Sequence, residues 1–517
     1  MDLPRSSGLL LHVTSLPSPF GIGDLGPTAY RFVDLLAGSA QRVWQMLPVV
    51  PVAYSYSPYA SPSTFAGNPM LISPERLLKA GLLHPDDLAE PPGLPDHAVA
   101  FEKVIPYKLT LLERAFERFE AGGDAVDRQA FAQFCKDNAD WLDDYALFMA
   151  LKEIHPDVSW TAWPPPLARR DPDTLAHART QYARAVSRHM FWQYLFDRQW
   201  AALHSYCREK GIAILGDLPI YVAHDSADVW AHPKLFFLDE TGNPTVVAGV
   251  PPDYFSETGQ RWGNPIYRWD VMQNNGFAWW TQRLQKALSL FDTIRLDHFR
   301  GFAAYWEVPA DEETAINGRW VDAPGTAIFE QLQANLGPLP ILAENLGIIT
   351  DDVVALMKRF DFPGMAVLQF AFGGDADGEH LPHNYPTALV AYTGTHDNDT
   401  LVGWWNNDQS TLGAEAVARE RAYALQYLNL DPDDMQDLHW RCIRALMASS
   451  ASLVVTPVQD VLGLDSRARM NTPGTVGGNW GWRLLPHQLD HLAGEPAARL
   501  RALTQIYGRT EDKQPPV

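Results

Sequence analysis

Short apolar stretches recur along the chain, and each one ends in polar residues, glycine or proline. Eight stand out, at 8–17, 42–51, 212–220, 293–299, 340–346, 365–372, 388–397 and 452–460. Nearly continuous apolar runs of this length are typical of strands that are buried on both faces, as in a parallel sheet. Helical patterns separate several of them, at 30–38, 279–290, 328–336 and 351–360. Eight alternations of strand and helix predict an α/β fold of the (β/α)8 type, the TIM barrel.

The gap between the second and third runs is too long for a simple connection. Amphipathic patterns cover 107–120 and 128–154 within it. We therefore expect the segment 52–178 to form a mostly helical insertion after the second strand. The pattern at 180–210 is assigned to the barrel's own second helix.

The rest of the chain adds smaller insertions to the barrel. We expect an insertion at 221–278 after the third strand, and it includes 249–267, where proline, glycine and aromatic residues are dense enough to predict a functional loop. A smaller insertion is expected at 302–325, after the fourth strand. The stretch 403–440 has mostly helical patterns, and a helix near 495–507 precedes a polar tail. This leaves no room for a C-terminal β-sandwich, so residues 1–517 are predicted to form a single catalytic barrel.

The composition is that of an ordinary globular protein, with 46% hydrophobic and 20% charged residues. The formal net charge of −21 argues against nucleic acid or an anionic membrane as a partner, and it is compatible with a neutral or cationic substrate. The 18 tryptophans offer flat faces of the kind that pack against sugar rings, although tryptophan is also a common core residue.

The cysteines and the N-terminus indicate the cellular setting. Cys135, Cys207 and Cys442 lie far apart and form no metal-binding spacing, which is typical of a reducing, cytoplasmic environment. The N-terminus lacks the basic start and apolar run of a signal peptide. No window approaches about 18 uninterrupted apolar residues, so we expect no membrane span.

Polar and charged residues gather at the predicted C-terminal ends of the strands, where a (β/α)8 barrel places its active site. Arg295 and Asp297 share one face of their strand because side chains alternate. Such a pair, taken alone, could simply be a buried ion pair at a strand end. Carboxyl groups converging from several strands favour chemistry instead, since two carboxyls in different environments carry out retaining glycoside cleavage. The residues at the strand ends are Asp217, Arg295, Asp297, His298, Glu344, Asn345, His396, Asp397, Asn398, Asp399, Gln459 and Asp460.

A metal site is an alternative use for histidine and aspartate at strand ends. His298 and His396 are single, without a His-x-His pair. The stretch 397–399 lacks the glycine and the bidentate glutamate of a calcium loop. We therefore expect neither a catalytic metal nor a cofactor.

Seven blocks of sequence are distinctive enough to be compared with known families. They are SPYASPSTFAGNP (57–69), GDLPIYVAHDSADVW (216–230), GVPPDYFSETGQRWGNPIY (249–267), IRLDHFRG (294–301), AENLG (343–347), GTHDNDT (394–400) and NTPGTVGGNWGWR (471–483). In this order they resemble the amylomaltases, the 4-α-glucanotransferases of glycoside hydrolase family 77, which are related to the α-amylase superfamily. The resemblance covers nearly the whole chain. Ala60 and Asn345 depart from the family pattern, which affects contacts around the site more than the class of reaction.

The resemblance implies a role for each of three carboxylates. Asp297 would be the nucleophile that forms a covalent glycosyl-enzyme, and Arg295 would keep it ionised and oriented. Glu344 would protonate the leaving glucan oxygen and then activate the acceptor hydroxyl, so we expect burial and neighbouring carboxylates to raise its pKa. Asp397 would hold the donor sugar and stabilise the oxocarbenium-like transition state. A retaining mechanism further predicts that the carboxyls of Asp297 and Glu344 lie about 5–5.5 Å apart.

The resemblance also implies a set of substrate-binding residues. His298 and His396 would bind sugar hydroxyls as neutral rings. Two loops over the cleft would exclude water and orient the acceptor, and we expect Tyr59 and Trp262 to retain it by ring stacking. The substrate-binding set is Ser57, Tyr59, Asp217, Gln260, Trp262, Arg295, His298, His396 and Asn471.

The function implied by the resemblance is transfer of α-1,4-glucan segments to the 4-hydroxyl of an acceptor glucan or of glucose. The expected partners are maltooligosaccharides, amylose and other α-1,4-glucans, and the chain is expected to be a monomer or a weak homodimer. Two alternatives remain, a hydrolytic α-glucosidase or α-amylase-like enzyme and a non-catalytic glucan-binding barrel. The presence of Asp297, Glu344 and Asp397 argues against the second.

Overall fold

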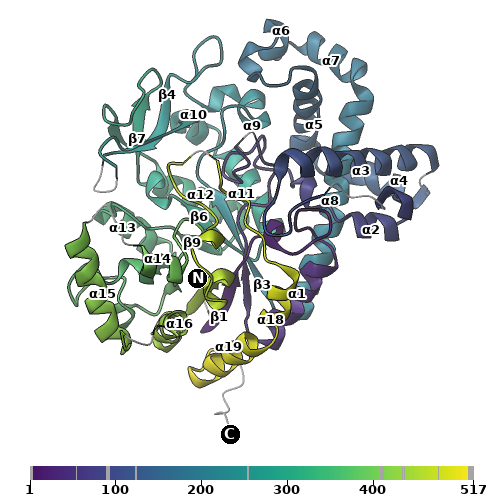
Figure 1. Ribbon diagram of the computed structural model, residues 1–517. Coiled ribbons are helices and arrows are strands. Elements are labelled where there is room, and N and C mark those ends of the chain that lie inside the picture. Colours follow the sequence, from purple (N-terminus) through teal and green to yellow (C-terminus); the bar gives the residue numbers. More distant parts are fainter. Residues whose placement is uncertain are drawn as a thin grey trace.

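An eight-stranded parallel sheet forms the centre of the molecule, with helices around it (Figure 1). The strand order is β10-β11-β12-β1-β2-β3-β6-β9, and it confirms the predicted (β/α)8 barrel. The strands are β1 (Ser6–Leu10), β2 (Val43–Gln45), β3 (Ala213–Pro219), β6 (Thr293–Asp297), β9 (Ile341–Ala343), β10 (Gly364–Val367), β11 (Leu389–Tyr392) and β12 (Leu453–Pro457). The computed structural model describes residues 4–53, 55–88, 93–122, 125–252, 256–407, 413–432, 435, 437–475 and 477–510.

The two ends of the sheet, β9 and β10, meet and close the barrel. The amide of Ala343 donates to the carbonyl oxygen of Pro363 at 2.9 Å. Nearby, the Asn345 side-chain oxygen accepts from the amide of Met365 at 2.7 Å. Asn345, one of the two residues that depart from the family pattern, therefore links the ends of β9 and β10 where the barrel closes.

Most strands occupy only the first part of their apolar run. The run at 8–17, for example, is a strand only as far as Leu10, and a short 3-10 turn follows at Val13–Ser15. The last residues of such runs form loops at the C-terminal ends of the strands. These loops carry most of the polar residues that the sequence predicted for the site.

Helices cover the barrel and build the insertion between β2 and β3, where α3, α4, α5 and α8 pack at one side (Figure 1). The helical pattern at 128–154 is two helices, α4 and α5, because the chain breaks at Asn138. The helices are α1 (Pro27–Gly38), α2 (Pro74–Lys79), α3 (Phe101–Gly122), α4 (Ala125–Asp137), α5 (Ala139–Ile154), α6 (Pro165–Ala168), α7 (Pro172–Gln181), α8 (Ala183–Glu209), α9 (Ala227–Ala231), α10 (Trp269–Asn274), α11 (Ala278–Leu290), α12 (Gly325–Leu336), α13 (Asp351–Arg359), α14 (Leu401–Asn406), α15 (Ala414–Leu428), α16 (Leu438–Ala448), α17 (Val458–Val461), α18 (Pro486–Leu492) and α19 (Glu495–Ile506).

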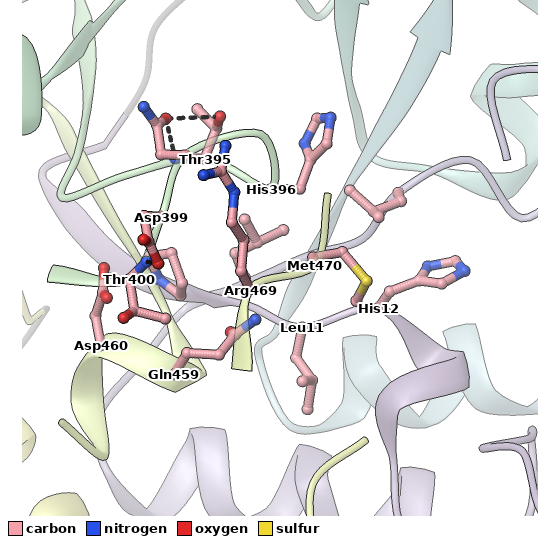
Figure 2. Close-up of a pocket in the computed structure, with 14 residues that line it drawn as sticks. Leu11, His12, Thr395, His396, Asp399, Thr400, Gln459, Asp460, Arg469 and Met470 are labelled. Atoms are coloured by element: carbon pink, nitrogen blue, oxygen red, sulfur yellow. Dashed lines mark hydrogen bonds between the residues drawn. The ribbon is translucent and has the colours of Figure 1, made fainter. Parts of the chain in front are cut away.

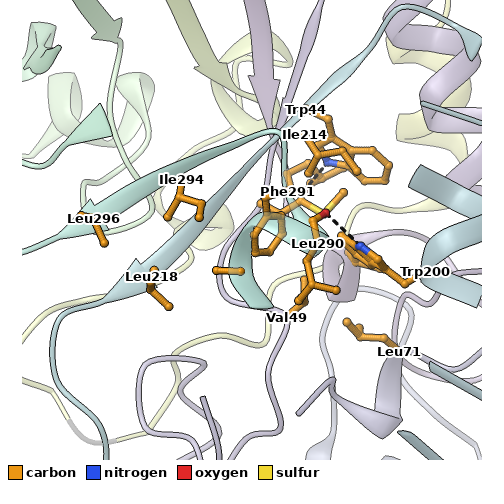
Figure 3. Close-up of a cluster of buried hydrophobic side chains, with 14 of the residues drawn as sticks. Trp44, Val49, Leu71, Trp200, Ile214, Leu218, Leu290, Phe291, Ile294 and Leu296 are labelled. Carbon is orange, nitrogen blue, oxygen red and sulfur yellow. Dashed lines mark hydrogen bonds between the residues drawn. The ribbon is translucent and has the colours of Figure 1, made fainter. Parts of the chain in front are cut away.

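The alternation along β6 separates its two faces. Ile294 and Leu296 point outward into the large hydrophobic cluster between the barrel and helices α8 and α11 (Figure 3). Within that cluster the indole nitrogen of Trp200 donates to the carbonyl oxygen of Leu290 at 3.1 Å, so its polar atom is satisfied. Arg295 lies between the two outward residues in sequence and therefore points into the barrel.

The stretch 249–267, predicted as a loop, contains a strand, and this prediction was wrong. A four-stranded antiparallel sheet, in the order β5-β4-β7-β8, lies beside the barrel mouth and includes part of the predicted insertion at 302–325. No continuous apolar run marks this sheet at its edges, because β5 and β8 carry mostly polar residues and are largely exposed. Residues 253–255 lie outside the described part of the stretch. The strands are β4 (Val246–Val250), β5 (Gln260–Pro265), β7 (Ala304–Pro309) and β8 (Arg319–Asp322).

The C-terminal part is helical, and α19 confirms the helix predicted near 495–507. The buried Arg509 follows it and donates to the carbonyl oxygens of Ser6 (3.1 Å) and Ala451 (2.9 Å). These contacts tie the end of the chain to the first and last strands. The remainder of the predicted polar tail, 511–517, lies outside the described residues. Across the described helices, none is both long and apolar enough to cross a membrane.

Candidate active site

Arg295 joins two carboxylates at the C-terminal ends of adjacent strands. The parallel register places Asp217 of β3 beside Arg295 of β6. Arg295 Nη1 donates to Asp217 Oδ2 at 2.6 Å, and Nη2 lies 2.8 Å from Asp297 Oδ1. The planar fork of arginine suits such a double contact, and both Arg295 and Asp217 are buried. Burial disfavours the guanidinium charge, but Asp217 and Asp297 outweigh burial and raise the pKa of Arg295, so it stays cationic.

Tyr59 reaches this pair from the loop after β2. Its hydroxyl donates to Asp217 Oδ2 at 2.7 Å, and its ring stacks on His396 with centroids 5.1 Å apart. Burial raises the pKa of Asp217, as does Asp297, while Arg295 opposes the shift. The other oxygen of Asp217, Oδ1, is buried and has no hydrogen-bond partner among the described residues. Asp217 thus holds Tyr59 and Arg295 in place with one oxygen.

Glu344 lies directly after β9 and is held by two backbone amides. Its Oε2 accepts from the amide of His298 at 2.8 Å, and its Oε1 accepts from the amide of Leu346 at 2.7 Å. Burial raises the pKa of Glu344 to about 7. The negative charge of Asp297 adds to this shift, and the positive charge of Arg295 opposes it. The predicted direction of the shift is confirmed. A carboxyl with this pKa can both give and take a proton near neutral pH.

His298 adopts a left-handed backbone conformation (φ 53°) directly after the strand. This region costs a residue other than glycine about 1–2 kcal/mol, and here it directs the His298 amide toward Glu344. Burial lowers the pKa of His298 to about 4, so its ring is neutral, as expected. The ring contacts Trp262 edge to face, with centroids 4.7 Å apart.

Asp397 is held as an anion by two neighbours. Asn471 Nδ2 donates to its Oδ1 at 2.6 Å, and His396 Nε2 lies 3.3 Å from its Oδ2. Burial favours the neutral acid, but His396 and Asn471 outweigh it and hold the pKa of Asp397 well below its ordinary range. Burial lowers the pKa of His396, yet Asp397 outweighs burial and raises it. His396 was expected to bind sugar as a neutral ring, and the contact with Asp397 shifts its balance toward the protonated form.

The side chains of Ser57 and Gln260 form hydrogen bonds with residues two positions along the chain. Ser57 Oγ accepts from the amide of Tyr59 at 3.2 Å and fixes the turn that presents that ring. Gln260 Oε1 accepts from the indole nitrogen of Trp262 at 3.2 Å. Tyr59 contacts the carboxylate cluster through His396, and Trp262 contacts it through His298. Ser57 and Gln260 instead support the segments that carry these two rings.

Arg469 is a functional candidate that the sequence did not single out. Its Nη2 donates to the carbonyl oxygen of Asp397 at 2.6 Å, and its Nε donates to the carbonyl oxygen of Asn471 at 2.7 Å. It lines a pocket behind the 394–400 loop (Figure 2). The only sequence signal was its position two residues before the 471–483 block.

Two other predicted strand-end carboxylates join neighbouring segments behind the cluster. Figure 2 shows Asp399 and Asp460 on the far side of Arg469 from His396. Asp399 accepts from Ser466, and Asp460 accepts from Thr393 and from a backbone amide. They stabilise the loops behind the cluster. Among the described residues, no group of three or more histidine, cysteine, aspartate and glutamate side chains is arranged to hold a metal ion.

Comparison with known proteins gives one consistent result. A family model described as 4-alpha-glucanotransferase matches residues 11–488. A 4-alpha-glucanotransferase of Thermus thermophilus is 50% identical over 514 residues, which cover 98% of this chain and 100% of that protein. One from Synechocystis is 48% identical, over 98% of each chain. A solved amylomaltase of Streptococcus agalactiae, in complex with acarbose, superposes with a TM-score of 0.92 at 38% identity, covering 98% of this chain and 100% of that one.

Proposed function

The chain belongs to the 4-alpha-glucanotransferase family, a family of transglycosylating enzymes acting on α-1,4-glucans, and we propose that its reaction is a retaining double displacement at Asp297, Glu344 and Asp397. One observation carries this proposal. Arg295 lies against Asp297, whereas Glu344, beside the same strand end, has a pKa raised to about 7. Two carboxyls whose environments differ in this way suit a nucleophile and a general acid.

In the first step Asp297 attacks the anomeric carbon of the donor glucan. The ion pair with Arg295 orients its carboxylate. Glu344 delivers its proton to the glycosidic oxygen as the bond to the leaving glucan breaks. The products are a covalent glycosyl-enzyme on Asp297, a free glucan with a new hydroxyl, and an ionised Glu344.

Asp397 supports the positive charge that develops on the donor ring. Its contacts with His396 and Asn471 keep it anionic throughout the reaction. Tyr59 and Asp217 lie beside it and form the donor side of the site, because Tyr59 stacks on His396 and donates to Asp217. This arrangement supports a role for Tyr59 in donor binding, in place of the acceptor stacking expected from the sequence.

In the second step an acceptor hydroxyl resolves the intermediate. The ionised Glu344 takes the proton from the 4-hydroxyl of a glucan or of glucose, which then displaces Asp297. Water competes for the same intermediate, so the acceptor must be held in place and water excluded. Trp262 is exposed by 39% and contacts His298 beside Glu344, which supports acceptor stacking by its ring.

The covalent intermediate provides the sharpest test. Glu344→Gln should react with α-maltosyl fluoride, whose leaving group needs no acid, and should accumulate a glycosyl-enzyme because the base for the second step is missing. Mass spectrometry of the peptides should locate the sugar on Asp297, and Asp297→Asn is the matched control. A sugar on another residue, or product of inverted configuration by NMR, would refute the mechanism.

The balance of transfer and hydrolysis is tested separately with maltotriose. The wild type should give a ladder of longer glucans with little net gain of reducing ends. Trp262→Ala should raise the share of hydrolysis, because the acceptor is held less firmly. An unchanged ratio of transfer to hydrolysis would contradict acceptor binding by Trp262.

A cytoplasmic setting and a monomeric or weakly dimeric state stay predictions. Free thiols at Cys135, Cys207 and Cys442 support the first. Light scattering across a dilution series would test the second.

A further inference from the structure

Two half-exposed tryptophans flank the segment that follows the catalytic strand. Trp262 and Trp320 are each exposed by 39%. Trp262 contacts the ring of His298, and the ring of Trp320 lies over the guanidinium of Arg300, 3.8 Å from its centroid. The proposed mechanism uses the first tryptophan and leaves the second without a role.

Trp320 is a rigid surface, because it is held from two sides. Arg300 supports one face of the ring. Trp306 of the neighbouring strand β7 contacts it edge to face, with centroids 5.3 Å apart, and its own indole nitrogen donates to the carbonyl oxygen of Ala315 at 2.9 Å. A preorganised aromatic ring loses little freedom when a ligand packs on it.

Arg300 also fixes Trp320 relative to the general acid. Its Nη1 donates to the carbonyl oxygen of Ile348 at 2.8 Å and to Thr350 Oγ1 at 3.1 Å. Both residues belong to the loop that follows Glu344. Ile348 is itself exposed by 49% and extends the apolar surface along that loop.

The proposed mechanism indicates on which side of the cleft, donor or acceptor, this surface lies. Glu344 exchanges its proton with the oxygen that joins the donor to the leaving chain, so leaving and acceptor glucans lie on the Glu344 side. Asp397, Asp217 and Tyr59 lie on the donor side. Trp320 is linked to the Glu344 loop through Arg300, and it therefore stands on the acceptor side.

We propose that Trp320 is a distal acceptor subsite, on which a glucose ring of a long α-1,4-glucan stacks while its 4-hydroxyl reacts at Glu344. The exposed indole surface offers an apolar contact for the C–H face of a sugar, and Asp322, on the same face of β8, is an exposed polar group for its hydroxyls. The ligand is a neutral glucan too long to be contained by the carboxylate cluster alone. The inference rests on the proposed transfer reaction and adds a determinant of acceptor length.

The test compares a short and a long acceptor. The donor is maltosyl fluoride at a fixed concentration, and the acceptors are glucose and maltoheptaose. Trp320→Ala should lower kcat/KM for maltoheptaose about tenfold, mostly through KM, and leave transfer to glucose unchanged. Trp320→Phe should retain most of the activity toward maltoheptaose because it keeps a flat ring. Ile506→Ala removes an apolar side chain of α19 that is exposed by 48%, and it should change the kinetics with neither acceptor.

The outcomes separate the possible roles. Equal losses with glucose and maltoheptaose would overturn the proposal, because they would mean that Trp320 only supports Arg300 and the Glu344 loop. Unchanged kinetics with both acceptors would overturn it as well. A wild type that transfers to neither acceptor would instead refute the proposed reaction, before any variant is compared.

Discussion

The hydroxyl of Tyr59 donates to Asp217 Oδ2 at 2.7 Å, across 158 residues of sequence. The same oxygen accepts from Arg295 at 2.6 Å. One buried carboxylate therefore aligns an aromatic ring on the donor side and the arginine that orients the nucleophile. We infer that this link matters to the rate of reaction more than to acceptor choice.

Tyr59→Phe should isolate the hydrogen bond, because it keeps the ring that stacks on His396. We expect kcat/KM for maltotriose disproportionation to fall about tenfold, which corresponds to about 1.4 kcal/mol. The matched control is Tyr206→Phe, since Tyr206 also donates to an aspartate (Asp34) at 2.7 Å, but on the surface. Equal rates for both variants and the wild type would contradict the role of this link.

The carboxylate cluster was largely predictable from the sequence, and the reason is geometric. Parallel strands end at the same edge of a barrel, so polar residues at the ends of apolar runs, such as Asp217 and Glu344, must gather there. Alternation along β6 also predicted that Arg295 and Asp297 share a face, and they lie 2.8 Å apart.

Features that depend on tertiary contacts were not predictable. The pKa of His396 is raised by Asp397, whose carboxylate lies 3.3 Å away, and no pattern in the sequence indicated this shift. Strands β5 and β8 lack the apolar runs that mark a buried strand, so the sheet that they border, and the position of Trp320 in it, could not be predicted. Arg469 acts through backbone carbonyls, which leave no pattern in a sequence.

Asp297→Asn should separate a catalytic role from a structural one. Loss of the nucleophile should reduce transfer by about 10⁴-fold or more. The free energy of unfolding should change by only about 1 kcal/mol, because Arg295 keeps its contact with the buried Asp217. Denaturant unfolding and maltotriose assays measure the two effects. Asp217→Asn is the comparison and should cost more stability, and a large loss of stability in Asp297→Asn itself would favour a structural ion pair.

Arg469→Met should disturb Asp397 and Asn471 without removing either side chain. Because Arg469 fixes the backbone of both, we expect kcat to fall by up to about 10²-fold, the cost of a small misplacement in an active site. Arg467→Met is the control, since Arg467 is 91% exposed and pairs with the nearby Asp465. Steady-state kinetics and thermal unfolding of both variants should be compared. A variant that loses stability but keeps kcat would show that Arg469 acts only in folding.

The pH dependence should reflect the proton on Glu344. With its pKa raised to about 7, kcat/KM for maltotriose should fall about tenfold for each pH unit above that value. Fluoride release from α-maltosyl fluoride should stay level over the same range, because fluoride leaves without an acid. A matching decline for both donors would assign the titration to another group.

The same proton should make stability depend on pH with a defined sign. The carboxyl of Glu344 titrates at about 7 in the folded chain and near its ordinary value of 4.5 when unfolded. Between these values the folded state holds a proton that the unfolded state has lost, so the free energy of unfolding falls as pH rises. The penalty, about 3 kcal/mol at most, is complete above pH 7.

Glu344→Gln cannot ionise and therefore avoids this penalty. Relative to the wild type, its free energy of unfolding should rise by about 2–3 kcal/mol between pH 5 and pH 8. The comparison across pH removes the constant cost of placing an amide against the backbone amides of His298 and Leu346. Glu379→Gln, at a side chain exposed by 81%, corrects for the general effect of losing one charge. Chemical denaturation at the two pH values measures both variants, and a difference that stays flat with pH would mean that Glu344 is ionised throughout and cannot serve as the acid.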